Sequence, residues 1–214
     1  MLPGAISGFL TIRPTLFDPS SAANTLTNVL AYGDLAHIGV QGLMTVILAQ
    51  ALTAVGFYAL FRERSPVAAF GLAGFGLVNC AAILTGTAAS WAALQIAPSL
   101  APEQAPLLQA LYLLEGNAWS LGNLFFGLWL IPMGLAARRS GEFHAGAVLG
   151  WLLVAGGVLY MVGALLSAVP EAVAAGVPDL CAMPATVGEV WMMGALILVG
   201  VRPAKAAAPI GSAS

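Results

Sequence analysis

A few polar and ionisable residues lie within or beside long apolar stretches, where such side chains are costly unless they have a partner or a function. His37 and Gln41 are one helical turn apart, so a helix would present both on one face and allow them to bind a ligand together. Asn123 lies near the start of a later apolar stretch, and Glu189 near the start of the last one. These four are the predicted ligand-binding residues.

Each of these polar residues also has a structural explanation. Glu189 is the strongest candidate, because a carboxyl about one turn into a short span needs a partner, a cavity or a proton. Its alternative is a first-turn acid favoured by the helix dipole. For His37 the alternative is hydration or hydrogen bonding near the membrane interface. Glu115 precedes an apolar run and is expected to be solvated, while Asn79 is expected to hydrogen-bond between helices.

Other chemistry has little support in the sequence. Two cysteines and two histidines are too few and too scattered for a metal site or a disulfide framework. His37 and His144 are expected on opposite sides of the bilayer, which excludes haem ligation by the pair. No serine has the strand, turn and helix setting of a hydrolase nucleophile. We therefore predict no metal and no catalytic residue, leave the cofactor open, and favour a protein that is not an enzyme.

The composition determines the class of protein. Of 214 residues, 60% are hydrophobic and 7% are charged, and the mean hydropathy is +0.93. Such a chain lacks the charged surface of a water-soluble domain, which makes it an integral membrane protein with the lipid bilayer as its first partner. Seven basic residues and a net charge of -2 leave no basic stripe, so we expect no nucleic-acid partner.

The pattern of apolar stretches predicts an all-α fold, a polytopic transmembrane helix bundle. Residues 1–34 are expected to form a short apolar segment and an extracytoplasmic loop with one short helix, and residues 202–214 a disordered cytoplasmic tail. The bundle, residues 35–201, has five predicted spans, or six if residues 1–12 cross the membrane. The five spans are expected at residues 35–61, 67–94, 118–137, 145–169 and 185–201. A linker at residues 95–109, which carries Pro98, Pro102 and Pro106, is expected between the second and the third span.

Charge and small residues predict how the bundle is oriented and held together. Six of the seven basic residues fall on one side of the alternating spans and only Arg13 on the other, so the positive-inside rule places the C-terminus in the cytoplasm of a cell inner (plasma) membrane. Pro132 is expected to bend its span near the cytoplasmic end, most simply to improve packing. The expected helix contacts are small residues: Ala69, Ala73, Gly76, Cys80, Ala82, Gly86, Gly146 and Gly150.

Four segments resemble a known family. They are residues 18–24 (DPSSAAN), 125–134 (FFGLWLIPMG), 138–141 (RRSG) and 188–191 (GEVW). Together they look like bacterial multipass proteins grouped as domain of unknown function 4386, over almost the whole chain. Members of that family begin with a complete spanning helix, where this chain has a shorter apolar stretch. The resemblance implies a fold and a location, and it transfers no reaction, cofactor or site residue.

Three functions remain open at this point. The first is binding of an apolar or amphiphilic small molecule, lipid or quinone-like, in an outward-facing polar pocket. The second is a structural accessory subunit that packs against a membrane protein partner or a second copy. The third is a proton-coupled transporter that uses Glu189. The lack of internal repeats, of broken helices and of acids deep in the membrane counts against the third.

Overall fold

The computed structural model describes residues 12–63, 65–140, 146–169 and 177–199. These residues form helices and contain no strand. The long helices are α4 (Gly33–Phe61), α5 (Pro66–Ile96), α6 (Ala105–Ser140), α7 (Gly146–Leu166) and α9 (Val177–Val199). The short ones are α2 (Arg13–Leu16), α3 (Ala22–Ala31), and the 3-10 helices η2 (Ala97–Ser99) and η3 (Pro102–Gln104).

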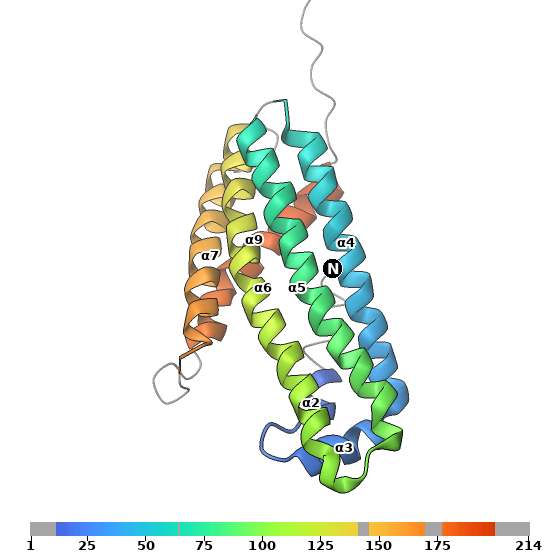
Figure 1. Ribbon diagram of the computed structural model, residues 1–214. Helices are drawn as coiled ribbons and strands as arrows, with labels where there is room; N and C mark the ends of the chain where they lie inside the picture. The colour runs from blue at the N-terminus through green and yellow to red at the C-terminus, as the bar shows by residue number, and fades with distance from the viewer. Residues whose placement is uncertain (1–11, 64, 141–145, 170–176, 200–214) are drawn as a thin grey trace, which may run out of the picture.

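The helices α4 to α7 run up and down beside one another (Figure 1). Each packs mainly on the next, α4 on α5, α5 on α6 and α6 on α7. Helix α9 packs on α7 and crosses the back of the bundle obliquely in this view (Figure 1). Helices α2 and α3 lie across the end where α4 begins, which we call the capped end; the other end carries Arg62 and Arg138.

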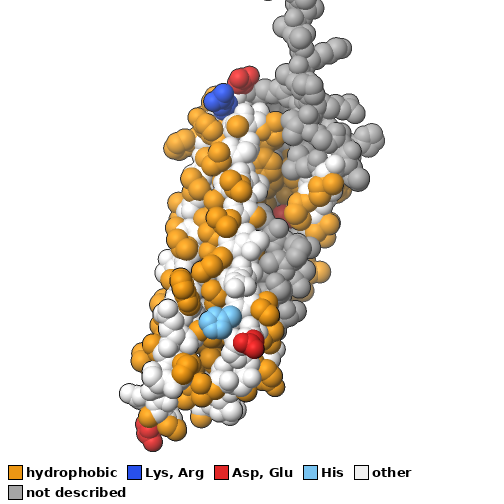
Figure 2. Space-filling view, turned by 90° about the vertical axis from the view of Figure 1, so that its right-hand side faces the viewer, with side chains coloured by type: hydrophobic (Ala, Val, Ile, Leu, Met, Phe, Trp, Pro, Cys, Tyr) orange, Lys and Arg blue, Asp and Glu red, His pale blue; other side chains and the backbone are white. Residues whose placement is uncertain are grey.

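Four stretches of the described chain are long and apolar enough to cross a membrane. Their outward surfaces are apolar too: Leu48 is 65% exposed, Leu52 73% and Phe70 74%. Figure 2 shows one such face, covered by hydrophobic side chains between the two ends of the bundle. The chain is therefore an all-helical membrane protein with several candidate spans. Those four are Gly33–Phe61, Pro66–Ser99, Pro102–Arg138 and Gly146–Leu166.

The four candidate spans match four of the five predicted spans. The fifth predicted span and the possible sixth one are not among them. The fifth predicted span, residues 185–201, overlaps α9, which is not among the four. The possible sixth span lies outside the described residues except for Ile12, and the predicted tail, residues 202–214, lies wholly outside them. A count of five or six spans thus stays a prediction.

The linker expected between residues 95 and 109 is shorter in the structure. Helix α5 continues to Ile96, and α6 already begins at Ala105. Pro98 is the second residue of η2, Pro102 is the first residue of η3, and Pro106 is the second residue of α6. A proline fits the first turn of a helix because the N–H that it lacks would have no partner there. The prolines that were interpreted as a linker are helix starts, and Glu115 consequently lies well inside α6.

The last helix also begins earlier than expected. Helix α9 starts at Val177 rather than at residue 185 and continues through Pro184. Glu189 therefore lies in the middle of α9, and the interpretation as a first-turn acid is wrong. Glu189 is therefore further from the start of its helix than the predicted span, residues 185–201, indicated.

Helices α6 and α7 approach so closely that two pairs of glycines face each other. A Cβ added to Gly127 would lie 2.5 Å from the carbonyl oxygen of Gly157, and one added to Gly134 would lie 2.5 Å from that of Gly150. Both helices repeat the glycine at the same spacing, so the two contacts form one line of close backbone packing. Of these four glycines, only Gly150 was an expected contact.

Helix α5 uses its small residues as expected. A Cβ on Gly76 would lie 2.9 Å from the methyl carbon of Ala54 in α4 and 3.0 Å from the Trp129 indole nitrogen in α6. A Cβ on Gly86 would lie 3.1 Å from the backbone carbonyl oxygen of Glu115. The predicted contacts at Gly76 and Gly86 are confirmed, and they bring α6 against α5 where Glu115 is buried.

Candidate functional site

The turn before α3 is organised by the side chain of Asp18. Its carboxylate accepts hydrogen bonds from the Ser20 backbone N–H at 2.9 Å, the Ser20 hydroxyl at 2.6 Å and the Asn24 amide at 2.8 Å. Ser21 caps the helix, since its hydroxyl accepts a bond from the Asn24 N–H at 3.2 Å. The bonds from Ser20, and then from Asn24, lower the pKa of Asp18 below its ordinary value.

A second group of hydrogen bonds ties this turn to α6. The fully buried Thr25 donates from its hydroxyl to the Gln109 side-chain oxygen at 2.8 Å. The Gln109 side-chain nitrogen in turn donates to the backbone carbonyl of Asp18 at 2.9 Å. Because these groups satisfy each other, α3 is held across the capped end by polar contacts as well as by apolar packing.

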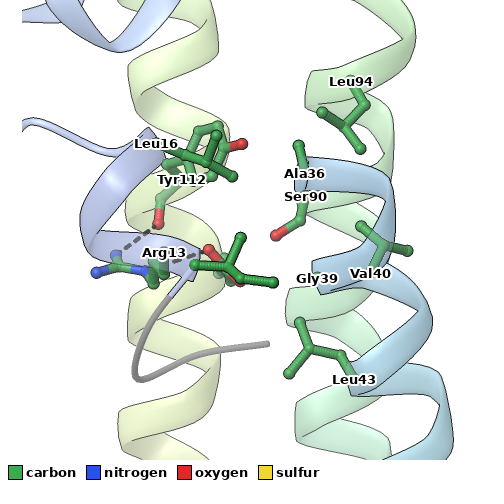
Figure 3. A pocket seen from close by; sticks show the side chains of 11 residues that line it. Arg13, Leu16, Ala36, Gly39, Val40, Leu43, Ser90, Leu94 and Tyr112 are labelled. Carbon is green, nitrogen blue, oxygen red and sulfur yellow. Dashed lines mark hydrogen bonds and ion pairs between the residues drawn. The ribbon is translucent and has the colours of Figure 1, made fainter. Parts of the chain in front are cut away.

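An ion pair connects α2 to α6 at the same end (Figure 3). The Arg13 Nε lies 3.2 Å from the Glu115 Oε2, and the Arg13 Nη2 donates to the Tyr112 carbonyl oxygen at 3.2 Å. The guanidinium carbon is 4.6 Å from the centre of the Phe17 ring. The Glu115 side chain is only 5% exposed and that of Arg13 20%. The acid is therefore buried beside a cation rather than solvated, which corrects the expectation for Glu115.

The burial of Glu115 follows from the residues around it. A carboxylate taken out of water needs a counter-charge and hydrogen bonds, and Arg13 supplies the charge. Gly86 lets the backbone of α6 come close to α5 at this level, and Ser90, one turn further along α5, adds a hydroxyl next to the ion pair. The site thus combines one charged pair with a tightly packed helix contact.

A small pocket opens beside this ion pair, with a volume of about 20 Å³. Four of its residues come from α4 at positions that share one face of the helix (Figure 3). The volume suffices for about one water-sized group. The pocket is lined by Ile12, Arg13, Leu16, Ala36, Gly39, Val40, Leu43, Ser90, Leu94, Tyr112 and Glu115.

Two of the predicted ligand-binding residues lie next to this pocket without lining it. His37 and Gln41 follow the pocket residues Ala36 and Val40 in α4, and both side chains are exposed. Successive residues of a helix point about 100° apart, so the two polar side chains occupy the neighbouring face. They share that face, as their spacing predicts.

The other two predicted residues lie elsewhere. Asn123 is partly buried in α6, and Glu189 is partly buried in α9, the helix that packs on α7. His37 and Gln41 belong to α4, whose main contact is α5, and none of the four residues lines the pocket beside Arg13. Their roles as ligand-binding residues stay predictions.

The residues that build the observed pocket were largely missed by sequence reasoning. Arg13 was counted only for its charge, and Tyr112 and Ser90 were not candidates. One signal was present: Arg13 was the only basic residue on the side of the membrane where Glu115 was also expected. Opposite charges on one side of a bundle with few charges favour pairing.

The part of the chain that the structure describes contains no group of three His, Cys, Asp or Glu side chains able to hold a metal ion. Within that part of the chain, Arg13 and Glu115 form an ion pair.

Long apolar helices and a polar site at one end define a membrane protein with several candidate spans. The chain belongs to the family described as domain of unknown function DUF4386, whose model matches residues 1–200. No curated protein and no solved structure matches the chain. The family description names no activity, so a function has to be argued from the site itself.

Proposed function

We propose that this membrane protein binds an amphiphilic small molecule, lipid or quinone-like, by its polar head at the pocket beside Arg13 and Glu115. The observation that carries the proposal is a buried ion pair at one wall of a pocket whose other lining residues are apolar except for Ser90 and Tyr112. Ligand sites in proteins commonly combine apolar walls with a few converging polar groups. No catalytic residue is assigned, and the proposed activity is binding.

The size of the pocket limits the part of the ligand that enters it. A volume of about 20 Å³ holds a single polar group, such as a carbonyl or a hydroxyl. The apolar remainder would lie along α4, where Val40 and Leu43 line the pocket and His37 and Gln41 follow on the next face. Since Arg13 and Glu115 balance each other's charge, the geometry favours a head without net charge.

Native mass spectrometry of the purified chain tests this proposal. We expect an amphiphile to remain bound after extraction in mild detergent, and Val40→Phe to reduce its occupancy by filling the pocket. Ile38→Phe is the matched control, because Ile38 lies on the same helix and is 54% exposed, whereas Val40 is 7% exposed. Loss of ligand in both variants, or in neither, would contradict the assignment. A stoichiometric protein partner in place of a ligand would favour an accessory subunit.

We also propose that the capped end faces outward and that the C-terminus is cytoplasmic, in a cell inner membrane. Arg62 and Arg138 lie at the end opposite the cap, as the positive-inside rule requires of a cytoplasmic end. Arg13, the basic residue at the other end, is neutralised by Glu115. Reporter fusions test the orientation: a fluorescent protein at the C-terminus should be active, and a periplasmic phosphatase there should not.

A further inference from the structure

A second membrane-level carboxyl, Glu189, lies far from the pocket and is not used by the proposed binding. In α9 it falls four residues after Ala185 and three before Met192, and both of these are buried in the core shared with α6 and α7. Residues at these spacings share one face of a helix. Glu189 is therefore on the face of α9 that packs on the bundle.

The depth of Glu189 follows from the contacts of α9 with α7. The Cα of Ala185 is 2.7 Å from the place of a Cβ on Gly156, which is the middle residue of α7. Gly188 is similarly close to Leu153, with 2.9 Å between the added Cβ and a side-chain methyl. Glu189 is about 6 Å further along its helix than Ala185, at 1.5 Å per residue. It thus lies near the middle of α7, and deeper than the outer half where it was expected.

Within the described parts of α6, α7 and α9, the groups that face Glu189 provide no positive charge. Tyr160 is near enough for its phenol to interact electrostatically with the carboxyl, and it is the titratable side chain of α7. The part of α6 from residue 118 to 137 has no titratable side chain, and at its end the Arg138 guanidinium lies 4.1 Å from the centre of the Trp151 ring. On α9 itself the titratable residues are Asp179 and Cys181, towards its start. Within the described chain, the Glu189 carboxyl has no ion pair or hydrogen bond.

We propose that Glu189 is a proton-binding site in the middle of the membrane, where the carboxylate takes up a proton from water and becomes a neutral acid. A carboxyl without a counter-charge in apolar surroundings is far less costly when neutral. The site exchanges one proton and needs no cavity for a larger ligand. Reversible proton uptake at this depth is the elementary step of proton-coupled membrane proteins.

Labelling with dicyclohexylcarbodiimide tests the proposal, because this apolar reagent adds to protonated carboxyls in apolar surroundings. The full chain in mild detergent should gain one adduct, which peptide mass mapping should place on Glu189. The adduct should decrease as the pH is raised, since the reagent needs the protonated acid. Glu189→Gln should abolish it.

Glu115→Gln is the matched control and should leave the adduct in place, because Glu115 is paired with Arg13 and should not react in the wild-type chain. An unlabelled wild-type chain, or an adduct that maps to another residue, would overturn the proposal. Mapping on the wild-type chain keeps the test valid even if Glu189→Gln is poorly folded. The result is independent of amphiphile binding, which involves α2, α4, α5 and α6.

Discussion

Among the described residues, the buried Glu115 and the partly buried Glu189 belong to regions held together in different ways. Glu115 lies at the capped end, where Arg13 pairs with it and hydrogen bonds from Thr25 and Gln109 fasten α3. Glu189 lies where α7 meets α9. In this region, α6 and α7 are held together by close glycine contacts and by packed aromatic rings. The comparison shows that the surroundings of a carboxyl decide what it can do. Glu115 forms an ion pair with Arg13, whereas Glu189 has no ion pair within the described chain and is available to bind a proton.

Each region has its own source of stability. At the capped end, polar groups satisfy one another at an edge of the bundle. In the other region the backbones of α6 and α7 approach directly, and the rings of Phe126 and Tyr160 meet edge to face at 5.2 Å. Substitutions should therefore act by steric clash in the second region and by loss of polar partners in the first.

The largest effect is expected from Gly134→Leu in α6. A side chain there meets the Gly150 carbonyl oxygen 2.5 Å from its Cβ, so α7 must move away. We expect a loss of about 3 kcal/mol or more, seen as a lower midpoint of thermal unfolding in detergent. Gly74→Leu is the control, because a Cβ at Gly74 meets nothing within 4 Å. Equal effects at both positions would refute the close contact.

A slightly smaller loss, about 3 kcal/mol, is expected from Arg13→Met, because the Glu115 carboxylate would stay buried without its cation. Adding Glu115→Leu should restore part of the stability, since it removes the unpaired charge. Unfolding of the two single variants and the double variant measures the coupling. Additive effects would show that the two side chains do not interact.

Gln109→Ala should cost about 1 kcal/mol, because it removes the side-chain acceptor of the buried Thr25 hydroxyl and a side-chain donor to the Asp18 carbonyl. The expected result is faster backbone hydrogen exchange in α3 with little change in α7. Gln95→Ala, at an exposed position of α5, serves as the control. Unchanged exchange in α3 would mean that apolar packing alone holds the cap.

The smallest effect concerns pH. Because its pKa is lowered in the folded chain, Asp18 stabilises the turn before α3 at pH values above the ordinary carboxyl pKa. That contribution should be lost as the pH falls through the lowered pKa. Hydrogen exchange of α3 in buffers below the ordinary Asp pKa of 3.8 should show the loss in the wild-type chain, and Asp18→Asn should lack this pH dependence. An identical profile for both would contradict the assignment.

Much of the fold could be predicted from the sequence, because apolar length and small residues act locally. The four candidate spans and the contacts of Gly76 and Gly86 follow from that information. The predicted linker at residues 95–109 was too long, because a proline is compatible with both a linker and the first turn of a helix. Pro98, Pro102 and Pro106 lie in first turns.

The candidate site was less predictable because it depends on contacts between distant segments. Arg13 and Glu115 are far apart along the chain, and only the fold over the capped end brings them together. The spacing of His37 and Gln41 correctly placed them on one face, but spacing does not tell which face of a helix meets its neighbours. Glu189 was predicted near the start of its helix, and its position in the middle of α9 became clear only from the true start of that helix.

The central claim, that the capped end holds an amphiphile, is tested most directly by photocrosslinking. A lipid or quinone-like probe with a photoreactive group next to its head would be incubated with the purified chain, irradiated, and mapped by peptide mass spectrometry. Our account predicts adducts within residues 36–43 of α4 and 12–16 at α2, which line the pocket, and their loss in Val40→Phe. Adducts spread over exposed positions such as Leu52 and Phe70, with none at the pocket, would contradict it.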